Sequence, residues 1–342
     1  MKPKSIKTLL TLAAFSIASS LVPTTQAQGP LTPPPGVPGP VMKSLDQVEA
    51  RTPLIPGSPG VAFSNGKFTI NQPGSYYLVS NLICSNDGTF IHLAGSFITL
   101  DLNGFSLIGT SNSAVAISGK GQGYHVRNGY IIGGTTLVND SFIPAGFYRG
   151  IELYDQDLPT EKGGSRVSDV TVFGVEDAAI TVSGNSIVTR CYVDTAGKEG
   201  ISAGIVQDCR AINTGNHAIA GSSVMNSTGR ALGFGNGIRA SDAVEGGTIE
   251  NCNGSSVNGA GIYGVVVSNS RGKSTYSNGI ECTLATGCFG QSSAGKGIVA
   301  WTVMNCVANR PPGGRAIEAI VANGCGSQGG GTNFINFKYN MP

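Results

Sequence analysis

Five segments in the second half of the chain repeat one pattern. They read GISAGIVQDCRAINTGN (200–216), AIAGSSVMNSTGRALGFGN (218–236), GIYGVVVSNSRGKSTYSN (261–278), GIECTLATGCFGQSSAGK (279–296) and GIVAWTVMNCVANRPPGG (297–314). An isoleucine stands at the same place in each unit and recurs mostly every 18 or 19 residues: Ile201, Ile219, Ile238, Ile262, Ile280, Ile298 and Ile317. This period is too short for a repeat that contains a helix, so each unit is predicted to be three short strands joined by turns.

Two more positions recur within each unit. A small residue stands eight positions after the isoleucine, with Cys252 displaced by an insertion: Cys209, Ser227, Ser270, Cys288, Cys306 and Cys325. The position before the small residue often holds a turn former: Asp208, Asn226, Asn251, Asn269 and Asn305. Asparagine tolerates the left-handed backbone conformation, so these residues are expected at a corner between two strands.

Such units bury their apolar faces only when they stack, about 4.8 Å per coil. The sequence therefore predicts an all-β chain, a single-stranded right-handed parallel β-helix of about eleven coils. Left-handed β-helices place an aliphatic residue at every sixth position. Six positions after the isoleucines stand residues such as Gln207, Ser268 and Asn323, and they do not fit that rule.

The same register extends toward the N-terminus with longer coils. The predicted anchors there are Ile180, Ile151, Val115 and Ile91, and the predicted corners are Arg190, Asp169, Asn128 and Asn103. The second residue after each anchor changes from bulky side chains such as Leu93 and Leu153 to small ones such as Ala300 and Ala319. The interior is therefore expected to narrow toward the C-terminus.

The ends of the chain have a different composition. Residues 1–27 start with basic residues, continue with an apolar run and end on Thr25, Gln26 and Ala27, the pattern of a secretory signal peptide cleaved after Ala27. Residues 28–60 are rich in proline and are expected to form a linker, in which Val41, Leu45 and Val48 could form a short cap. The β-helix is predicted to occupy residues 61–332, and residues 333–342 to form a C-terminal cap or tail.

The charge of the chain is nearly balanced. It contains 22 Lys and Arg and 20 Asp and Glu, and removal of the signal peptide would also remove Lys2, Lys4 and Lys7. An almost uncharged protein lacks the long-range field that draws nucleic acids or anionic membranes. Neither is expected as a partner, and no later apolar run is long enough to cross a bilayer.

The eight cysteines can be interpreted in three ways. Six of them, beginning with Cys191, occupy the small-residue position together with serines, as in a buried column of small side chains. One disulfide could instead link Cys191 to Cys209, Cys288 to Cys306, or Cys306 to Cys325. A metal site is the third alternative, but the chain has no CxxC pair and only three scattered histidines, so no metal or cofactor is expected.

Several segments resemble a known group of proteins. ITLDLNGFSLIG (98–109), YHVRNGYIIGG (124–134) and the coils that follow are similar to the right-handed parallel β-helix proteins of the pectin-lyase-like superfamily. GPLTPPPGVPGPVMKSLDQVEARTPL (29–54) with FTINQPGSYYLVSNL (68–82) resembles the start of secreted bacterial β-helix proteins that lack an assigned activity. The superfamily includes lyases, hydrolases, esterases, tailspikes and adhesins, so the resemblance implies a fold without selecting a reaction.

The residue after each anchor is expected to point outward from the first sheet. This column is His92, Ala116, Glu152, Thr181, Ser202, Ala220, Arg239, Tyr263, Glu281, Val299 and Glu318. Arg239 could bind the charge of a uronate, Tyr263 could stack on a sugar, and Glu281 and Glu318 could act as acid and base. Two coils separate these glutamates by about 9.6 Å, near the 6.5–9.5 Å of inverting glycosidases. The alternative is that all four are ordinary solvated residues of a strand.

A second set of polar residues surrounds two insertions, Tyr154–Arg166 and Ala240–Thr248. Both insertions are predicted to leave the stack at the same corner and to bracket His217, Lys198 and Glu199. Their acidic residues could bind a hard cation such as calcium, although their spacing is irregular, and the alternative is a pair of solvated loops.

Three functions remain open from the sequence. The first is an exported β-helix scaffold that presents a surface to polysaccharide or to the cell envelope. The second is a divergent polysaccharide lyase or glycoside hydrolase that acts on the first-sheet face. The third is an assembly or adhesive protein. The paired-Asp and Gly-His-Gly signatures of polygalacturonases are missing, and so are the GxSxG, P-loop and HExxH motifs, so the sequence does not decide whether the protein is an enzyme.

Overall fold

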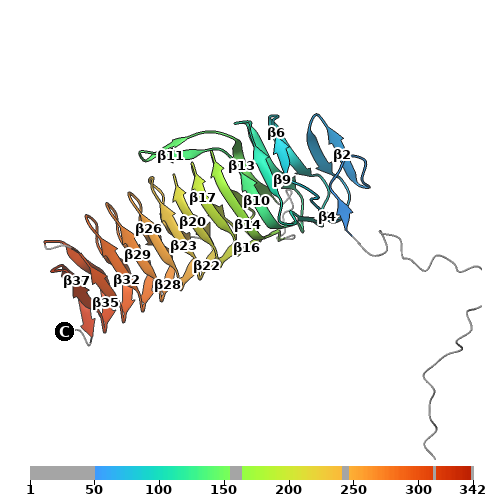
Figure 1. Cartoon of the computed structure of the whole chain (residues 1–342). Helices are drawn as coiled ribbons and strands as arrows, with labels where there is room; N and C mark the ends of the chain where they lie inside the picture. The colour runs from blue at the N-terminus through green and yellow to red at the C-terminus, as the bar shows by residue number, and fades with distance from the viewer. Residues whose placement is uncertain (1–50, 155–163, 241–245, 311–312, 340–342) are drawn as a thin grey trace, which may run out of the picture. The chain divides into compact units, whose positions relative to one another are not determined.

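The computed structural model describes residues 51–154, 164–240, 246–310 and 313–339. These residues belong to one compact unit, Glu49–Pro342. All of their strands except two join a single 35-stranded sheet that winds from coil to coil (Figure 1). The unit is a right-handed parallel β-helix, as predicted, with about 14 turns where the sequence indicated about eleven.

Each full coil contributes one strand to each of three faces, which we call sheets A, B and C. Sheet A contains β3 (Lys67–Ile70), β6 (Gly88–Leu93), β9 (Ala114–Lys120), β13 (Phe147–Tyr154), β15 (Ile180–Val182), β18 (Ile201–Ser202), β21 (Ile219–Gly221), β24 (Ile238–Ala240), β27 (Ile262–Tyr263), β30 (Ile280–Glu281) and the first parts of β33 (Ile298–Met304), β35 (Arg315–Asn323) and β37 (Thr332–Tyr339). This sheet is the predicted first sheet.

Sheets B and C complete each coil. Sheet B contains β1 (Thr52–Pro53), β4 (Gly74–Tyr77), β7 (Ile98–Asp101), the first parts of β10 (His125–Ile132) and β14 (Arg166–Val175), β16 (Ile187–Thr189), β19 (Ile205–Gln207), β22 (Ser223–Met225), β25 (Thr248–Glu250), β28 (Val266–Ser268), β31 (Leu284–Thr286) and the second parts of β33, β35 and β37. Sheet C contains β5 (Leu82–Cys84), β8 (Ser106–Gly109), the second parts of β10 and β14, β17 (Tyr192–Ala196), β20 (Arg210–Thr214), β23 (Thr228–Ala231), β26 (Asn253–Ser256), β29 (Arg271–Ser274), β32 (Phe289–Ser292), β34 (Val307–Asn309) and β36 (Gly326–Gln328).

The repeated isoleucines form one buried column in sheet A. Each pairs in parallel register with the isoleucine of the next coil, from Ile201 through to Ile317. All seven are fully buried. The pairing confirms the repeat register over the second half of the chain.

One predicted anchor is wrong by two residues. Ile117, not Val115, pairs with Ile91 on one side and with Ile151 on the other. The strands of these wider coils begin earlier, so Val115 lies beside Thr89, before the anchor position. Consequently Ala116 is buried, and the outward residue of this coil is Ser118, which pairs with His92.

The corner between sheets B and C has the predicted left-handed backbone. The φ angles lie between 48° and 58° at Asn103, Asn128, Asp169, Arg190, Asp208, Asn226, Asn251, Asn269 and Asn305. Neighbouring corners are also linked, because the Asn226 amide donates to Asp208 Oδ1 at 3.1 Å and the Asn251 amide donates to Asn226 Oδ1 at 3.3 Å. The short polar side chains thus allow the turn and connect one coil to the next.

The residue after each corner in the second half of the chain is a buried cysteine or serine. We call this column the Cys/Ser ladder: Cys191, Cys209, Ser227, Cys252, Ser270, Cys288, Cys306 and Cys325. All eight cysteines of the chain are free thiols. In a ladder position the side chain donates to the carbonyl two residues earlier, as Cys209 does to Gln207 at 3.1 Å and Ser227 does to Met225 at 2.7 Å. It also accepts a backbone N–H from the preceding coil, as Cys209 Sγ does from Cys191 N at 3.4 Å.

These contacts explain why cysteine and serine can replace each other in the ladder. Both side chains carry one donor and can accept, so either one pairs the backbone N–H of the preceding coil and adds a second donor to a carbonyl that already accepts a backbone N–H. Burial raises the pKa of Cys252 to about 11 and that of Cys282, outside the ladder, to about 12. These two thiols therefore remain protonated at neutral pH.

The remaining strands lie at the two ends of the stack or in a separate hairpin. At the N-terminal end β2 (Val61–Ser64) pairs antiparallel with β3, and at the C-terminal end β37 covers the last coil as one more parallel rung. β11 (Thr136–Val138) and β12 (Ser141–Ile143) form a separate hairpin that extends along the stack (Figure 1), and the Phe142 ring lies against the turn at Gly215.

The predicted signal peptide and most of the predicted linker lie outside the described residues. In the part of the chain that the structure describes, none of the segments is a helix with the length and apolar character to span a membrane.

The Cys/Ser ladder leads to a stability prediction. Replacing Cys252 by alanine would leave Ser227 N without its partner and would remove one of the two donors to the Glu250 carbonyl, which still accepts from Asn226 N. We expect a loss of about 1–3 kcal/mol in the free energy of unfolding in urea. The matched variant Cys252→Ser keeps both contacts and should lose less than half as much. Equal losses in the two variants would show that the thiol acts only by filling space.

Candidate functional site

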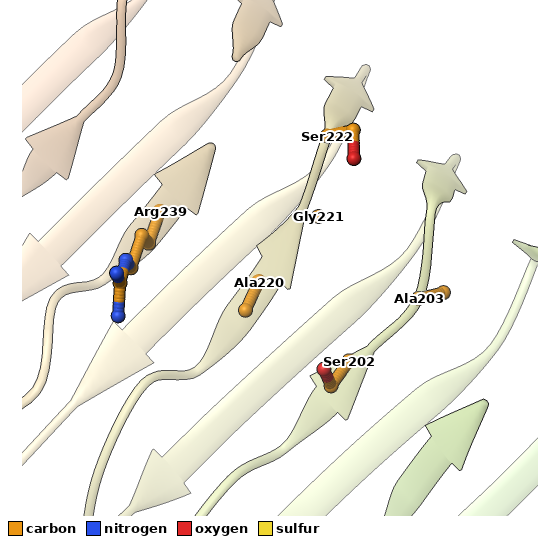
Figure 2. Close-up of a pocket in the computed structure, with 6 residues that line it drawn as sticks. All are labelled: Ser202, Ala203, Ala220, Gly221, Ser222 and Arg239. Carbon is orange, nitrogen blue, oxygen red and sulfur yellow. The ribbon is translucent and has the colours of Figure 1, made fainter. Parts of the chain in front are cut away.

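A groove lies on the outer face of sheet A. Its floor is Thr181, Ser202 and Ala220, the outward residues of three successive strands, and it encloses about 460 Å³. A smaller hollow of about 230 Å³ adjoins it at Ser202, Ala220 and Arg239. Figure 2 shows these three residues in a row on β18, β21 and β24. The groove exists because three consecutive outward positions carry small side chains.

One wall of the groove comes from the turns between sheets C and A. Glu199 and His217 stand two positions before their anchor isoleucines, and Asp177 and Lys198 stand three positions before theirs. The turns stack as the strands do, so these side chains follow one another along the groove. The structure therefore brings Lys198, Glu199 and His217 together beside the groove, as the sequence indicated.

The two insertions begin close to the groove. Tyr154 and Arg239, which both line it, stand just before the segments 155–163 and 241–245. The acidic residues expected to bind a cation there, Asp155, Asp157, Glu161, Asp242 and Glu245, lie outside the described residues. Within the described ranges, no group of three His, Cys, Asp or Glu side chains is arranged to hold a metal ion.

A buried carboxylate organises the N-terminal end of the groove. Asp177 is 4% exposed and accepts from Arg149 Nε at 2.7 Å and Lys198 Nζ at 2.8 Å. Arg149 also pairs with Glu152, which accepts from the Tyr154 hydroxyl at 2.8 Å. Burial by itself would raise the pKa of Asp177, but the hydrogen bonds from Lys198 and Arg149 outweigh burial and lower it. Burial and the contact with Glu152 raise the pKa of Tyr154 to about 12.

His217 and Arg239 form a donor pair at the other end of the groove. The backbone N–H of Asn236 donates to His217 Nδ1 at 2.8 Å, so Nδ1 accepts and the ring proton lies on Nε2. Burial and the nearby Arg239 lower the pKa of His217, which is neutral at pH 7. Arg239 Nη1 lies 3.2 Å from His217 Nε2. Two donors thus lie side by side, an arrangement that an acceptor oxygen in contact with both would stabilise.

The two glutamates predicted to be catalytic continue the same outward column. Register places Tyr263 next to Arg239, Glu281 next to Tyr263, and Glu318 two rungs beyond Glu281. The expected spacing along the sheet is therefore present, but Arg239 is the one member of the predicted set that lines the groove.

The surroundings of these two glutamates differ. Glu318 accepts from Lys296 Nζ at 2.9 Å and also pairs with Arg315, and these bonds, Arg315 first, lower its pKa. Glu281 accepts from the Asn278 amide at 2.9 Å. A general acid needs a raised pKa, so Glu318 is suited to the base role and not to the acid role. A catalytic role for either residue stays a prediction.

Sequence reasoning missed Arg149 and Asp177. Both occupy positions that hold charged residues in other coils: Asp177 is three positions before its anchor, like Lys198, and Arg149 is two positions before its anchor, like Glu199 and His217. Alignment of the coils on their anchors and comparison of these two turn positions would have revealed them.

Comparison with known proteins finds two solved structures with loose similarity. One is the A-module of a mannuronan C-5 epimerase from Azotobacter vinelandii, with 10% identity, a TM-score of 0.36, and coverage of 79% of this chain and 91% of that chain. The other is the enzymatically active domain of tailspike protein 2 from bacteriophage CBA120, with 15% identity, a TM-score of 0.32, and coverage of 81% of this chain and 40% of that chain. At these scores no residue or reaction transfers between the proteins. No protein-family model and no curated protein matches the chain.

The Asp177 cluster leads to a prediction about pH. Because its folded pKa is lowered below the ordinary value of an aspartate, about 3.9, Asp177 stabilises the fold fully above about pH 5 and loses this contribution as the pH falls through the folded pKa. Asp177→Asn should cost about 1–3 kcal/mol in the free energy of unfolding at pH 7, with a smaller difference from the unmodified protein at pH 3. A difference that is constant from pH 7 to pH 3 would contradict the role of the ion pairs.

Proposed function

We propose that the protein is an exported β-helix scaffold whose sheet A groove binds an acidic sugar of a polysaccharide. The donor pair of His217 and Arg239 carries the proposal, because its two donors lie 3.2 Å apart at the edge of a hollow. A carboxylate oxygen is the acceptor that suits it, since it can take both hydrogen bonds and one of them is charge-assisted.

The shape of the groove supports a sugar ring as the rest of the ligand. The floor of Thr181, Ser202 and Ala220 is small and partly polar, and the stacked strands make it straight along the coils. The walls supply acceptors as well as donors, for example Glu199, which itself accepts from the Asn216 amide at 2.6 Å. Hydroxyl groups of a sugar can pair with both kinds of group.

The chemistry of the groove favours binding over bond cleavage. A lyase needs a base that can take a proton from the sugar, but His217 holds its ring proton on Nε2 and uses Nδ1 for the Asn236 backbone. Tyr154, with its pKa raised to about 12, also keeps its proton at neutral pH. Lys198 is held by Asp177, and the carboxylate of Glu199 already accepts from the Asn216 amide at 2.6 Å. The divergent lyase or hydrolase that would use Glu281 and Glu318 is therefore the second candidate, and the experiment below tests it as well.

Export belongs to the proposal. The basic start, the apolar run and the small residues before Gln28 are the features that support a secretory signal peptide. The natural ligand would then be a polysaccharide outside the cytoplasm.

The proposal is tested by calorimetric titration with trigalacturonate and with neutral galactotriose. The unmodified protein should bind the acidic sugar and not the neutral one. Arg239→Gln should weaken binding of trigalacturonate about 10- to 100-fold, because it removes a charge-assisted hydrogen bond. His217→Phe should weaken it less, since it removes one neutral donor.

A matched control is Lys338→Gln, which removes one exposed positive charge from β37 at the last rung, away from the groove. It should bind trigalacturonate like the unmodified protein, and equal loss in Lys338→Gln and Arg239→Gln would contradict a site at the groove. Unsaturated ends or new reducing ends after long incubation, abolished in Glu281→Gln or Glu318→Gln, would favour the enzyme instead.

A further inference from the structure

The outer face of sheet C carries positive charge over four successive coils. Arg210 on β20, Arg230 on β23, and Arg271 and Lys273 on β29 all point outward and are exposed. None of the four forms an ion pair with an acid among the described residues. We call these four side chains the basic stripe.

Negative charge is missing from the strands that carry the stripe and from the sheet C strands that follow them. The six strands β20, β23, β26, β29, β32 and β34 contain no Asp or Glu. Three acids lie beside these strands: Asp194 on β17 accepts from Tyr192, Thr195 and Asn213, Asp208 at the corner before β20 accepts from Gln207 and Asn226, and Glu250 is exposed at the end of β25. The near-balance of charge over the whole chain therefore hides a strong local excess of positive charge.

The stripe runs along the axis of the stack. Arg210, Thr228, Asn253 and Arg271 are register partners in successive coils, so Arg210 and Arg271 lie three rungs apart, about 14 Å. Ser255 separates Arg230 from Lys273 in the neighbouring column, by two rungs or about 10 Å. A ligand that meets all four charges must be an extended chain with repeated negative groups.

The residues between the charges indicate the kind of chain. Asn253, Ser255, Gln291 and Asn309 line the same face and can pair with hydroxyl groups. Phe289 lies under Arg271, with its ring centre 4.9 Å from the guanidinium carbon, and offers an apolar surface beside it. Widely spaced charges alternating with amides and hydroxyls match a polysaccharide that carries one acid per sugar better than a nucleic acid, whose charge density is higher.

We propose that the sheet C face, through the basic stripe, docks an extended acidic polysaccharide along the axis of the β-helix. This surface is separate from the sheet A groove, which binds one acidic sugar, and it does not depend on the groove. The two surfaces differ in what they bind: the groove binds a single carboxylate, and the basic stripe binds a row of carboxylates.

The test is the binding of long polygalacturonate, measured by biolayer interferometry at several salt concentrations. Arg230→Gln/Lys273→Gln should weaken binding roughly 2- to 30-fold, the range for two exposed ion pairs. The slope of log K against log salt should become shallower by about 1 to 2. Arg230→Glu/Lys273→Glu should weaken binding further. Both side chains are exposed, so the midpoints of thermal unfolding should not change.

The matched control is Lys67→Gln/Lys338→Gln, which removes the same charge from sheets A and B. It should retain the affinity and the salt slope. The proposal is overturned if this control loses as much as the stripe variants, or if single-stranded DNA of equal charge binds as tightly as polygalacturonate. Loss in Arg239→Gln with no loss in the stripe variants would also overturn it, and would leave the groove as the binding site.

Discussion

Parallel pairing between consecutive coils is the constraint on which the whole molecule depends. Each strand takes its hydrogen bonds from the coil before and the coil after, so a residue's place in the 18- or 19-residue repeat fixes its neighbours. Side chains that are distant in sequence but equivalent in the repeat lie about 4.8 Å apart. The isoleucine column, the corner residues and the Cys/Ser ladder are three results of this one rule.

The ladder shows how the constraint governs buried polar groups. After a corner with a left-handed residue, the next backbone N–H has no partner in the sheet, and a buried group left unpaired is costly. One small donor–acceptor side chain per coil solves this, and stacking repeats the solution. Cysteine is useful here because it fills the interior like an apolar residue and still makes a weak hydrogen bond.

Function depends on the residues that point outward. Stacking aligns their positions along each sheet but does not determine which residue type stands at each position. Three small residues in succession create the groove, and charged residues in the adjoining turns surround it. On sheet C the same mechanism aligns cations from separate coils. A β-helix can therefore build an elongated recognition surface from single residues contributed by successive repeats.

Much of this arrangement could be predicted from the sequence because the repeat is regular. The anchors from Ile201 onward and the corner residues followed directly from spacing. The register predicted from the spacing was wrong at Val115. The strand of this wider coil starts earlier, and a shift of two residues keeps the same alternation of inward and outward side chains. Arg149 and Asp177 could have been found by comparing the turn positions of aligned coils, but the ion pairs of Asp177 with Arg149 and with Lys198 needed the structure. The groove itself needed the structure, since its depth depends on the size of neighbouring side chains on three strands.

Stacking in register is tested most directly by removal of one coil. Deletion of residues 280–297 removes 18 residues and places Ile298 where Ile280 stood, next to Ile262. Circular dichroism with thermal unfolding should show a β-sheet protein with one cooperative transition at slightly reduced stability. Deletion of nine residues, 280–288, shifts all later positions by half a coil and should unfold the C-terminal part. If both deletions behave alike, the superposition of equivalent positions does not hold the molecule together.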